Sequence, residues 1–152
     1  MNDNQITPEL MLCFGVYRLQ HAFGALYKPL LAPLGLTYAQ YLVMTVLWDG
    51  GQLSVGQIGA RLELESSTLT PLIKRLERAG HVTRKRDVDD ERRVLIGLTE
   101  QGETLRARAQ GIPDCIHAAT GLDADAVNAL RSKLGDLHAA VARAAAETDI
   151  SG

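Results

Sequence analysis

The sequence predicts a mainly α-helical protein of a single domain, residues 1–152, with a small β-hairpin. Apolar residues recur at three- and four-residue spacing over most of the chain, which is the periodicity of an amphipathic helix. Two segments open with the residue pattern of a helix capping box. Between residues 81 and 98 the pattern changes to two short runs rich in Val, Thr, Leu and Ile, which is typical of a hairpin.

The first long helix is expected within the segment 7–35, beginning at Thr7. Thr7 precedes Pro8, which would take the first helical position, where its missing N–H costs nothing. Pro33 and Gly35 are expected to end this helix. The apolar stripe that defines it consists of Leu12, Val16, Leu19, Phe23, Leu26 and Leu30.

Three shorter helices follow, each opened by a hydroxyl side chain. Thr37-Tyr38-Ala39-Gln40 is a capping box that begins a helix over 37–49, and Ser54-Val55-Gly56-Gln57 begins another over 54–62. Ser66 is expected to cap the next helix, which runs to Ala79 and is stopped by a glycine.

The hairpin and the last helices complete the chain. The strands are expected over 81–86 and 93–98, joined by the charged segment 87–92. Thr99 caps a further helix to about Gln110, which Gly111 and Pro113 then interrupt. A final helix begins at Asp123 and carries a coiled-coil-like seam of Val127, Leu130, Leu134, Leu137 and Val141.

Two short capped helices followed by a hairpin form a winged helix-turn-helix, and its second helix, 66–79, is the one expected in the DNA major groove. Although the net charge is −2, residues 61–99 carry nine Lys/Arg against seven Asp/Glu, a local balance of +2. An ordinary amphipathic surface helix is the alternative for this segment alone. The candidate DNA contacts of the helix are Ser66, Ser67, Thr68, Thr70, Lys74 and Arg75, with Arg78 beyond them.

The hairpin carries a specific motif. Asp90-Glu91-Arg92, followed after five further residues by Leu98-Thr99, matches the D-x-R-x-x-x-x-x-L-T pattern, and the chain resembles the MarR family of regulators over nearly its whole length. The resemblance implies that Arg92 enters the DNA minor groove and that Asp90 holds its guanidinium. A narrow groove concentrates negative potential and favours a planar cation. Arg84, Arg86 and Arg93 are expected on phosphates, which give affinity without sequence information; a merely solvated hairpin is the alternative.

The same resemblance implies a homodimer. The helices within 7–35 and 99–147 would form its interface, and 36–98 the DNA-binding lobe. Two recognition helices would then lie about 34 Å apart and face a palindromic operator in double-stranded DNA.

Cys13 lies within the first helix, where an isolated cysteine is usually a small buried hydrophobe. Tyr27 is nearly in phase with it, but fourteen residues along one helix correspond to roughly 21 Å. The two side chains cannot touch within one intact helix, but they could meet if the first helices of two subunits crossed in antiparallel orientation.

The surroundings of this cysteine resemble one branch of the MarR family, the organic hydroperoxide-resistance regulators. The resemblance rests on Leu12-Cys13-Phe14, Tyr17, Tyr27-Lys28-Pro29-Leu30-Leu31 and Leu36-Thr37-Tyr38-Ala39-Gln40-Tyr41. It implies that Cys13 reacts with an organic hydroperoxide as effector and that Tyr27 and Tyr38 reach it from the partner subunit. Tyr17 would be tied to the switch, and Phe14 and Phe23 would line an apolar thiol pocket.

Members of that branch carry either one cysteine or a second, resolving cysteine in the region of Cys115, and this chain resembles the latter group. The implied product is a disulfide between Cys13 and Cys115 of the partner subunit, formed through a sulfenic acid. Because the local motif is weak, an incidental Cys115 is the alternative.

Several other classes of protein are not expected. No apolar run approaches the ~20 residues that span a membrane, and the first residues lack the pattern of a signal peptide. We therefore expect a cytoplasmic protein with reduced thiols at rest. No metal-ligand spacing, cofactor motif or catalytic motif is present, so we expect no metal, no cofactor and no enzyme.

Two other functions stay open at this stage. In one, the chain is a MarR-type regulator released by a small phenolic or apolar ligand, and Cys13 is incidental. In the other, the chain is a thiol enzyme that reduces peroxides, but this leaves the hairpin without a role.

Overall fold

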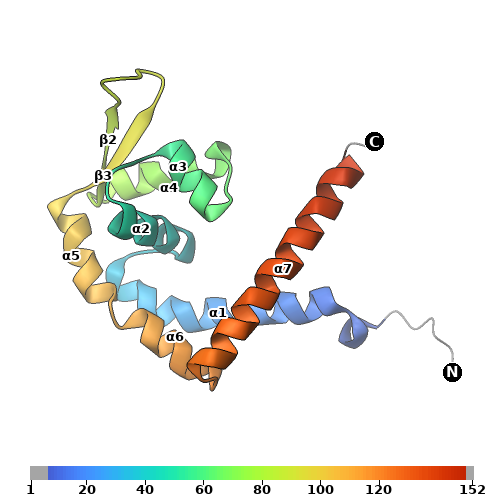
Figure 1. Ribbon diagram of the computed structural model, residues 1–152. Coiled ribbons are helices and arrows are strands. Elements are labelled where there is room, and N and C mark those ends of the chain that lie inside the picture. The colour runs from blue at the N-terminus through green and yellow to red at the C-terminus, as the bar shows by residue number, and fades with distance from the viewer. Residues whose placement is uncertain (1–6, 150–152) are drawn as a thin grey trace, which may run out of the picture. The chain divides into compact units, whose positions relative to one another are not determined.

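The computed structural model describes residues 7–149, so expectations for residues 1–6 and 150–152 lie outside the described residues (Figure 1). The chain is mainly helical with a small antiparallel sheet, which confirms the predicted fold class. Its elements are η1 (Pro8–Leu10), α1 (Leu12–Leu31), η2 (Ala32–Leu34), α2 (Tyr38–Gly50), β1 (Leu53–Ser54), α3 (Val55–Leu62), α4 (Ser66–Arg78), β2 (Val82–Arg86), β3 (Val94–Leu98), α5 (Glu100–Ala109), α6 (Ile112–Thr120) and α7 (Ala124–Asp149).

The chain forms two compact units that divide between Ile112 and Pro113. The first unit holds α1 to α5 and the sheet, and the second holds α6 and α7. The assignment of 7–35 and 99–147 to a dimer interface stays a prediction.

The start of the first helix differs from the sequence prediction. Pro8 opens only a short 3-10 turn, and the Thr7 side chain makes no capping hydrogen bond. Met11 is extended, with φ −87° and ψ 121°, so that α1 begins at Leu12 instead. The predicted end is confirmed, because α1 stops at Leu31 and Gly35 closes the following 3-10 turn with φ +68°.

The two predicted capping boxes are confirmed. The Thr37 N–H donates to Gln40 Oε1 at 2.9 Å, and the Gln40 N–H donates to Thr37 Oγ1 at 3.3 Å. In α3 the matching distances between Ser54 and Gln57 are 2.8 and 3.1 Å. Each box satisfies backbone groups that a helix start otherwise leaves without partners.

The predicted cap of α4 is wrong in detail. Ser66 is the first residue inside α4, and the preceding residue, Glu65, takes the N-cap position without a side-chain capping bond. The connection from α3 to α4 is tight, and it places the helix start one residue earlier than expected. A Cβ at Gly59 would lie 2.6 Å from the Leu64 carbonyl oxygen, and Glu63 turns the chain with φ +54°.

The sheet has three antiparallel strands in the order β1-β3-β2. The predicted hairpin is confirmed, each strand beginning one residue later than expected, and its register places Val82 opposite Leu98 and Arg86 opposite Val94. The short strand β1, which pairs Leu53 with Ile96, was not predicted. The hairpin of β2 and β3 projects from the group of α2, α3 and α4, as a wing does (Figure 1).

One apolar core holds this group together. Its fully buried members come from α2, α3, α4 and β3, and burial of each such side chain stabilises the fold by about 1.5–3 kcal/mol. These residues are Val43, Met44, Leu47, Ile58, Leu69, Ile73, Leu76 and Ile96.

The second unit is a pair of helices with a tight connection. Gly121 turns the chain with φ +66°, and the Leu122 carbonyl oxygen lies 3.0 Å from His117 Nε2. Asp123 caps α7 as predicted, because its carboxylate accepts the Ala126 N–H at 2.8 Å.

Between residues 7 and 149, no individual helix combines the length and apolar character needed to cross a membrane. The segments Leu12–Leu34 and Tyr38–Gly50 satisfy that test only as a pair, across a bend of 66°.

Candidate nucleic-acid interface and thiol site

The wing presents one arginine far into solvent. Arg92 has 94% of its side chain exposed, and Asp90 Oδ1 lies 3.5 Å from its Nε. The same carboxylate oxygen accepts the Arg92 backbone N–H at 3.1 Å. Asp90 therefore restrains the base of Arg92, while the guanidinium remains accessible.

A second aspartate, which the sequence reasoning missed, organises the loop. Asp87 Oδ1 accepts the Asp89 N–H at 3.0 Å, and its Oδ2 lies 3.7 Å from Arg93 Nη1. The Asp87 N–H also donates to the Arg93 carbonyl at 2.9 Å and closes the hairpin. An aspartate bonded to the backbone two residues later is a known turn former, and this pattern was the available signal.

Helix α4 has a buried face and a hydroxyl-rich face. Leu69, Ile73 and Leu76 are buried in the core. The candidate contacts Ser66, Ser67, Thr68, Lys74 and Arg75 are exposed, and Thr70 is half-buried. The small hydroxyl side chains allow bases and phosphates to approach the first turns of this helix closely.

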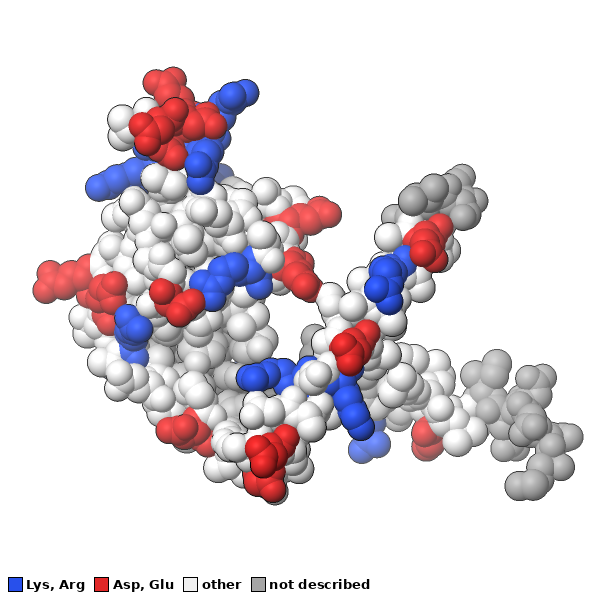
Figure 2. All heavy atoms as spheres, viewed as in Figure 1, with Lys and Arg blue, Asp and Glu red and all other residues white. Residues whose placement is uncertain are grey.

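The remaining basic candidates differ in how free they are. Arg84 on β2 is paired with Glu77 on α4, with 3.3 Å between Nε and Oε2, and Arg93 shares the Asp87 carboxylate. Arg86 is exposed at the end of β2. Acidic and basic side chains are mixed at the wing, at the top of the view, so the wing is not a continuous basic patch (Figure 2).

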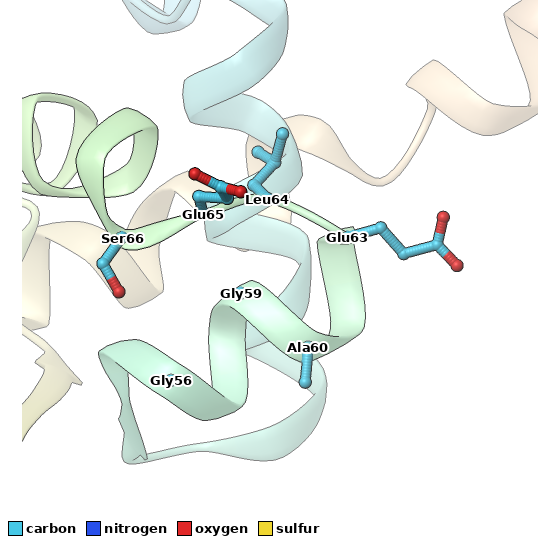
Figure 3. A pocket seen from close by; sticks show the side chains of 7 residues that line it. All are labelled: Gly56, Gly59, Ala60, Glu63, Leu64, Glu65 and Ser66. Atoms are coloured by element: carbon cyan, nitrogen blue, oxygen red, sulfur yellow. The ribbon is translucent and has the colours of Figure 1, made fainter. Parts of the chain in front are cut away.

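A shallow hollow of about 520 Å³ lies at the turn between α3 and α4 (Figure 3). Glu63 and Glu65 line it together with small residues and Leu64, and their carboxylates point in different directions. With two acidic side chains and no basic one in its lining, the hollow is not suited to an anion.

The thiol of Cys13 lies in the first turn of α1 and is exposed. Tyr17, one turn further on, is 57% exposed, and its ring centroid lies 4.4 Å from that of His21. Phe14 and Phe23 on the same helix are half-buried. Within residues 7–149 of one chain, no thiol pocket closes around Cys13.

The two tyrosines expected to reach Cys13 from the partner subunit lie away from it in this chain: Tyr27 is in the last turns of α1, and Tyr38 is the first residue of α2. The ring centroids of Tyr27 and Tyr38 are 4.6 Å apart, and Tyr41, which the sequence reasoning did not single out, lies 6.0 Å from Tyr27. Burial, together with the neighbouring Tyr38 and Tyr41, raises the pKa of Tyr27 to about 12. Tyr27 is therefore protonated at neutral pH and can donate a hydrogen bond.

Cys115 belongs to the second unit, in the first turn of α6, and its thiol is free and exposed. The helix interruption predicted just before it is confirmed, because α5 ends at Ala109 and α6 begins at Ile112.

An exposed hydroxyl-rich helix beside a hairpin with a projecting arginine defines a DNA-binding regulator of the winged-helix class. The family model described as transcriptional regulator SarA/Rot matches residues 25–108. The chain belongs to the MarR family of winged-helix transcriptional regulators, as the relatives also show.

Two relatives are similar to this chain over most of its length. The HTH-type transcriptional regulator TtmR of Methylorubrum extorquens is 45% identical over 97% of this chain and 76% of its own length. The organic hydroperoxide resistance transcriptional regulator of Bacillus subtilis is 43% identical over 83% of this chain and 86% of its own.

The crystal structure of AbfR of Staphylococcus epidermidis is 34% identical, with a TM-score of 0.72 over 87% of this chain and 91% of that chain. AbfR has also been solved in a reduced form bound to DNA, in a disulfide form and in an overoxidized form bound to DNA. The resemblance to the hydroperoxide-resistance branch is confirmed at the level of sequence.

Proposed function

We propose that this protein is a transcriptional repressor that senses organic peroxides through Cys13 and binds a palindromic operator as a homodimer. One observation carries the proposal: a winged-helix chain exposes a single thiol on α1 and holds a pair of phenols near the far end of that helix. Two relatives support it: the Bacillus subtilis protein is an organic hydroperoxide resistance regulator, and AbfR has been solved in a reduced form and in a disulfide form.

The DNA-binding part of the proposal rests on the first unit. Helix α4 enters the major groove with its hydroxyl-rich first turns, and Arg92 of the wing enters the minor groove. Arg86 and Arg93 contact phosphates. Arg84 contacts a phosphate only when its ion pair with Glu77 opens.

Apolar side chains that the first unit leaves exposed support dimerisation. On α1 these include Leu12 at 68% and Val16 at 46% exposure. Such a surface favours a protein partner. If two α1 helices cross in antiparallel orientation, Cys13 of one subunit meets Tyr27 and Tyr38 of the partner subunit, whose hydroxyl groups can donate to its sulfur.

The chemistry at Cys13 is a two-electron oxidation. The thiolate sulfur attacks the O–O bond of the hydroperoxide, an S–O bond forms, and the O–O bond breaks. Cys13 becomes a sulfenic acid that carries the terminal OH of the hydroperoxide, and the alkoxide departs, takes up one proton and becomes an alcohol. Protonated Tyr27 is suited to stabilise the attacking thiolate.

Cys115 of the partner subunit then attacks the sulfenic sulfur, which forms a disulfide and releases water. A disulfide requires the two Cα atoms within about 7 Å of each other. Where the reduced cysteines lie further apart than this, the helices that carry them must move for the bond to form. The recognition helices of the dimer consequently lose their register on DNA.

The test uses an operator selected from a library of random duplexes with the reduced protein. The wild type and a Cys13→Ser variant are titrated on this duplex before and after treatment with cumene hydroperoxide. We expect peroxide to release the wild type and to leave the variant bound. A variant that is released as readily as the wild type would show that Cys13 is not the sensor and would favour release by a ligand.

The same samples, run on a non-reducing gel, test the resolving step. We expect a disulfide-linked dimer from the wild type and none from Cys13→Ser or Cys115→Ser. A linked dimer that persists in Cys115→Ser would remove Cys115 from the mechanism.

A further inference from the structure

Trp48 is the only tryptophan of the chain, and the proposed chemistry at Cys13 does not use it. Its indole Nε1–H on α2 donates to the carbonyl oxygen of Gly102 on α5 at 3.0 Å. This bond joins residues 54 positions apart in the sequence. The indole ring meets Tyr41 edge-on, with ring centroids 6.2 Å apart.

On one side, Trp48 continues a series of aromatic rings. Tyr41 is only 6% exposed and contacts Tyr27, which in turn contacts Tyr38. All three ring separations, 4.6, 6.0 and 6.2 Å, lie within the range of direct aromatic contact. Close-packed rings absorb little displacement, so a shift of Tyr27 is passed on to Trp48.

On the other side, the Gly102 segment holds both ends of the wing. A Cβ at Gly102 would collide with the carbonyl oxygen of His81, just before β2. That carbonyl accepts the N–H of Thr99, just after β3, at 3.1 Å. The Thr99 hydroxyl donates to the Gly80 carbonyl at 2.6 Å. The base of the wing is therefore fixed to the place where Trp48 binds α5.

We infer that Trp48 is a positioning residue that couples the tyrosine cluster of α1 and α2 to the base of the wing. This inference rests on the proposed function, because it assigns the route by which oxidation near Tyr27 changes the grip on DNA. The indole N–H is the group that transmits the coupling, since among the described residues it makes the hydrogen bond from α2 to the Gly102 carbonyl. When Tyr27 moves toward an oxidised Cys13 of the partner subunit, the indole ring is displaced. Its hydrogen bond to the Gly102 carbonyl then changes in geometry, and the wing shifts.

The test compares Trp48→Phe, which keeps an aromatic ring but removes the donor, with Thr45→Val as the matched control. Thr45 is on the same helix, and among residues 7–149 its hydroxyl donates only to the Leu42 carbonyl within α2, at 2.7 Å. The measured quantity is the ratio of the operator Kd after cumene hydroperoxide to the Kd before it. This ratio cancels any effect of the substitution on basal binding. Mass spectrometry follows the oxidation of Cys13 in the same samples.

We expect the ratio in Trp48→Phe to fall by about fivefold or more below the wild-type ratio, with Cys13 oxidised to the same extent. The ratio of Thr45→Val should equal that of the wild type. A wild-type ratio in Trp48→Phe would overturn the coupling role and leave peroxide sensing intact. A wild type that peroxide does not release would overturn the proposed function and the coupling together.

Fluorescence gives a second readout that needs no substitution at Trp48. Because Trp48 is the only tryptophan, the emission spectrum of the wild type reports on its indole alone. We expect peroxide to shift this emission in the wild type and in Thr45→Val, but not in Cys13→Ser. If Trp48→Phe fails to fold, this measurement decides, and an unchanged wild-type emission on DNA release overturns the inference.

Discussion

Arg92 is held at its base and free at its end. Its backbone N–H and its Nε both face Asp90 Oδ1, and 94% of its side chain is exposed. A side chain restrained before binding loses less conformational entropy when it enters a groove. The pair is too exposed to contribute much to folding stability, which fits a role on DNA.

Replacing Arg92 with Gln removes the charge and keeps most of the side-chain length. We expect the affinity for the selected operator to fall by about tenfold or more, because contacts of this kind contribute roughly 1–3 kcal/mol. Arg106→Gln, an equal charge change at an exposed position on α5, is the control. Fluorescence anisotropy of labelled operator measures both, and an equal loss in the two variants would contradict a specific role for Arg92.

We expect His81 to make the stability of the first unit depend on pH. The residue is only 7% exposed, and its Nδ1 has no hydrogen-bond partner within the described part of the chain. Burial lowers the pKa of His81 below the ordinary value of 6.5. The unfolded chain thus binds a proton more readily than the folded chain, so stability is retained above pH 6.5 and lost as the pH falls below it.

We expect the free energy of unfolding in urea to decrease between pH 7.5 and pH 5.5. The decrease should be smaller in His81→Gln, which cannot take up the proton. His21→Gln, at an exposed histidine of α1, should retain the wild-type decrease. Equal pH profiles in His81→Gln and the wild type would exclude His81 as the source.

At the scale of elements, short-range patterns predicted most of the fold. Thr37 and Ser54 lie three residues before a glutamine, and both capping boxes form as expected, because a box depends only on residues within one turn. The hairpin was predicted with nearly its true ends, since its two strands pair with each other across a short turn.

What the sequence could not predict depends on contacts between distant residues. Strand β1 is two residues long and exists only because β3 pairs with it. Trp48 and Tyr41 gain their importance from contacts with Gly102 and Tyr27 that no local spacing indicates. The candidate thiol and its tyrosines were singled out by residue type and resemblance, but the sequence could not show how their rings pack.

Gly102 is the position where α5 presses on the chain that enters β2. Gly102→Ala would push a Cβ into the His81 carbonyl, which is backbone and cannot rotate away. We expect the free energy of unfolding to fall by about 1–3 kcal/mol. Gly56→Ala is the control, because its Cβ would have Ser54 Oγ at 3.9 Å as its nearest neighbour and would favour the helix. Urea denaturation measures both, and equal stabilities would contradict the close contact.

At the scale of the whole molecule, each unit exposes an apolar helix face. Tyr17 and Val16 on α1 are 57% and 46% exposed, and Val141 and Leu130 on α7 are 59% and 44% exposed. A monomeric protein rarely leaves such rows in water. They support the proposed homodimer, in which the tyrosines of one subunit complete the site around the thiol of the other.

In the proposed mechanism, the peroxide reacts on α1, and α4 and the wing bind the DNA. Under this proposal, oxidation leaves Arg92 chemically unchanged, and Arg92 leaves the minor groove only because the dimer moves. A reversible change at Cys13 should therefore give a reversible change in DNA binding.

One titration tests this connection between thiol and operator. The operator Kd is measured for reduced protein, for the same protein after cumene hydroperoxide, and after dithiothreitol has reduced it again. We expect the Kd to rise by about tenfold or more on oxidation and to return to its first value on reduction. A Kd that stays constant through the cycle, in protein whose Cys13 is shown to be oxidised, would contradict redox control of DNA binding.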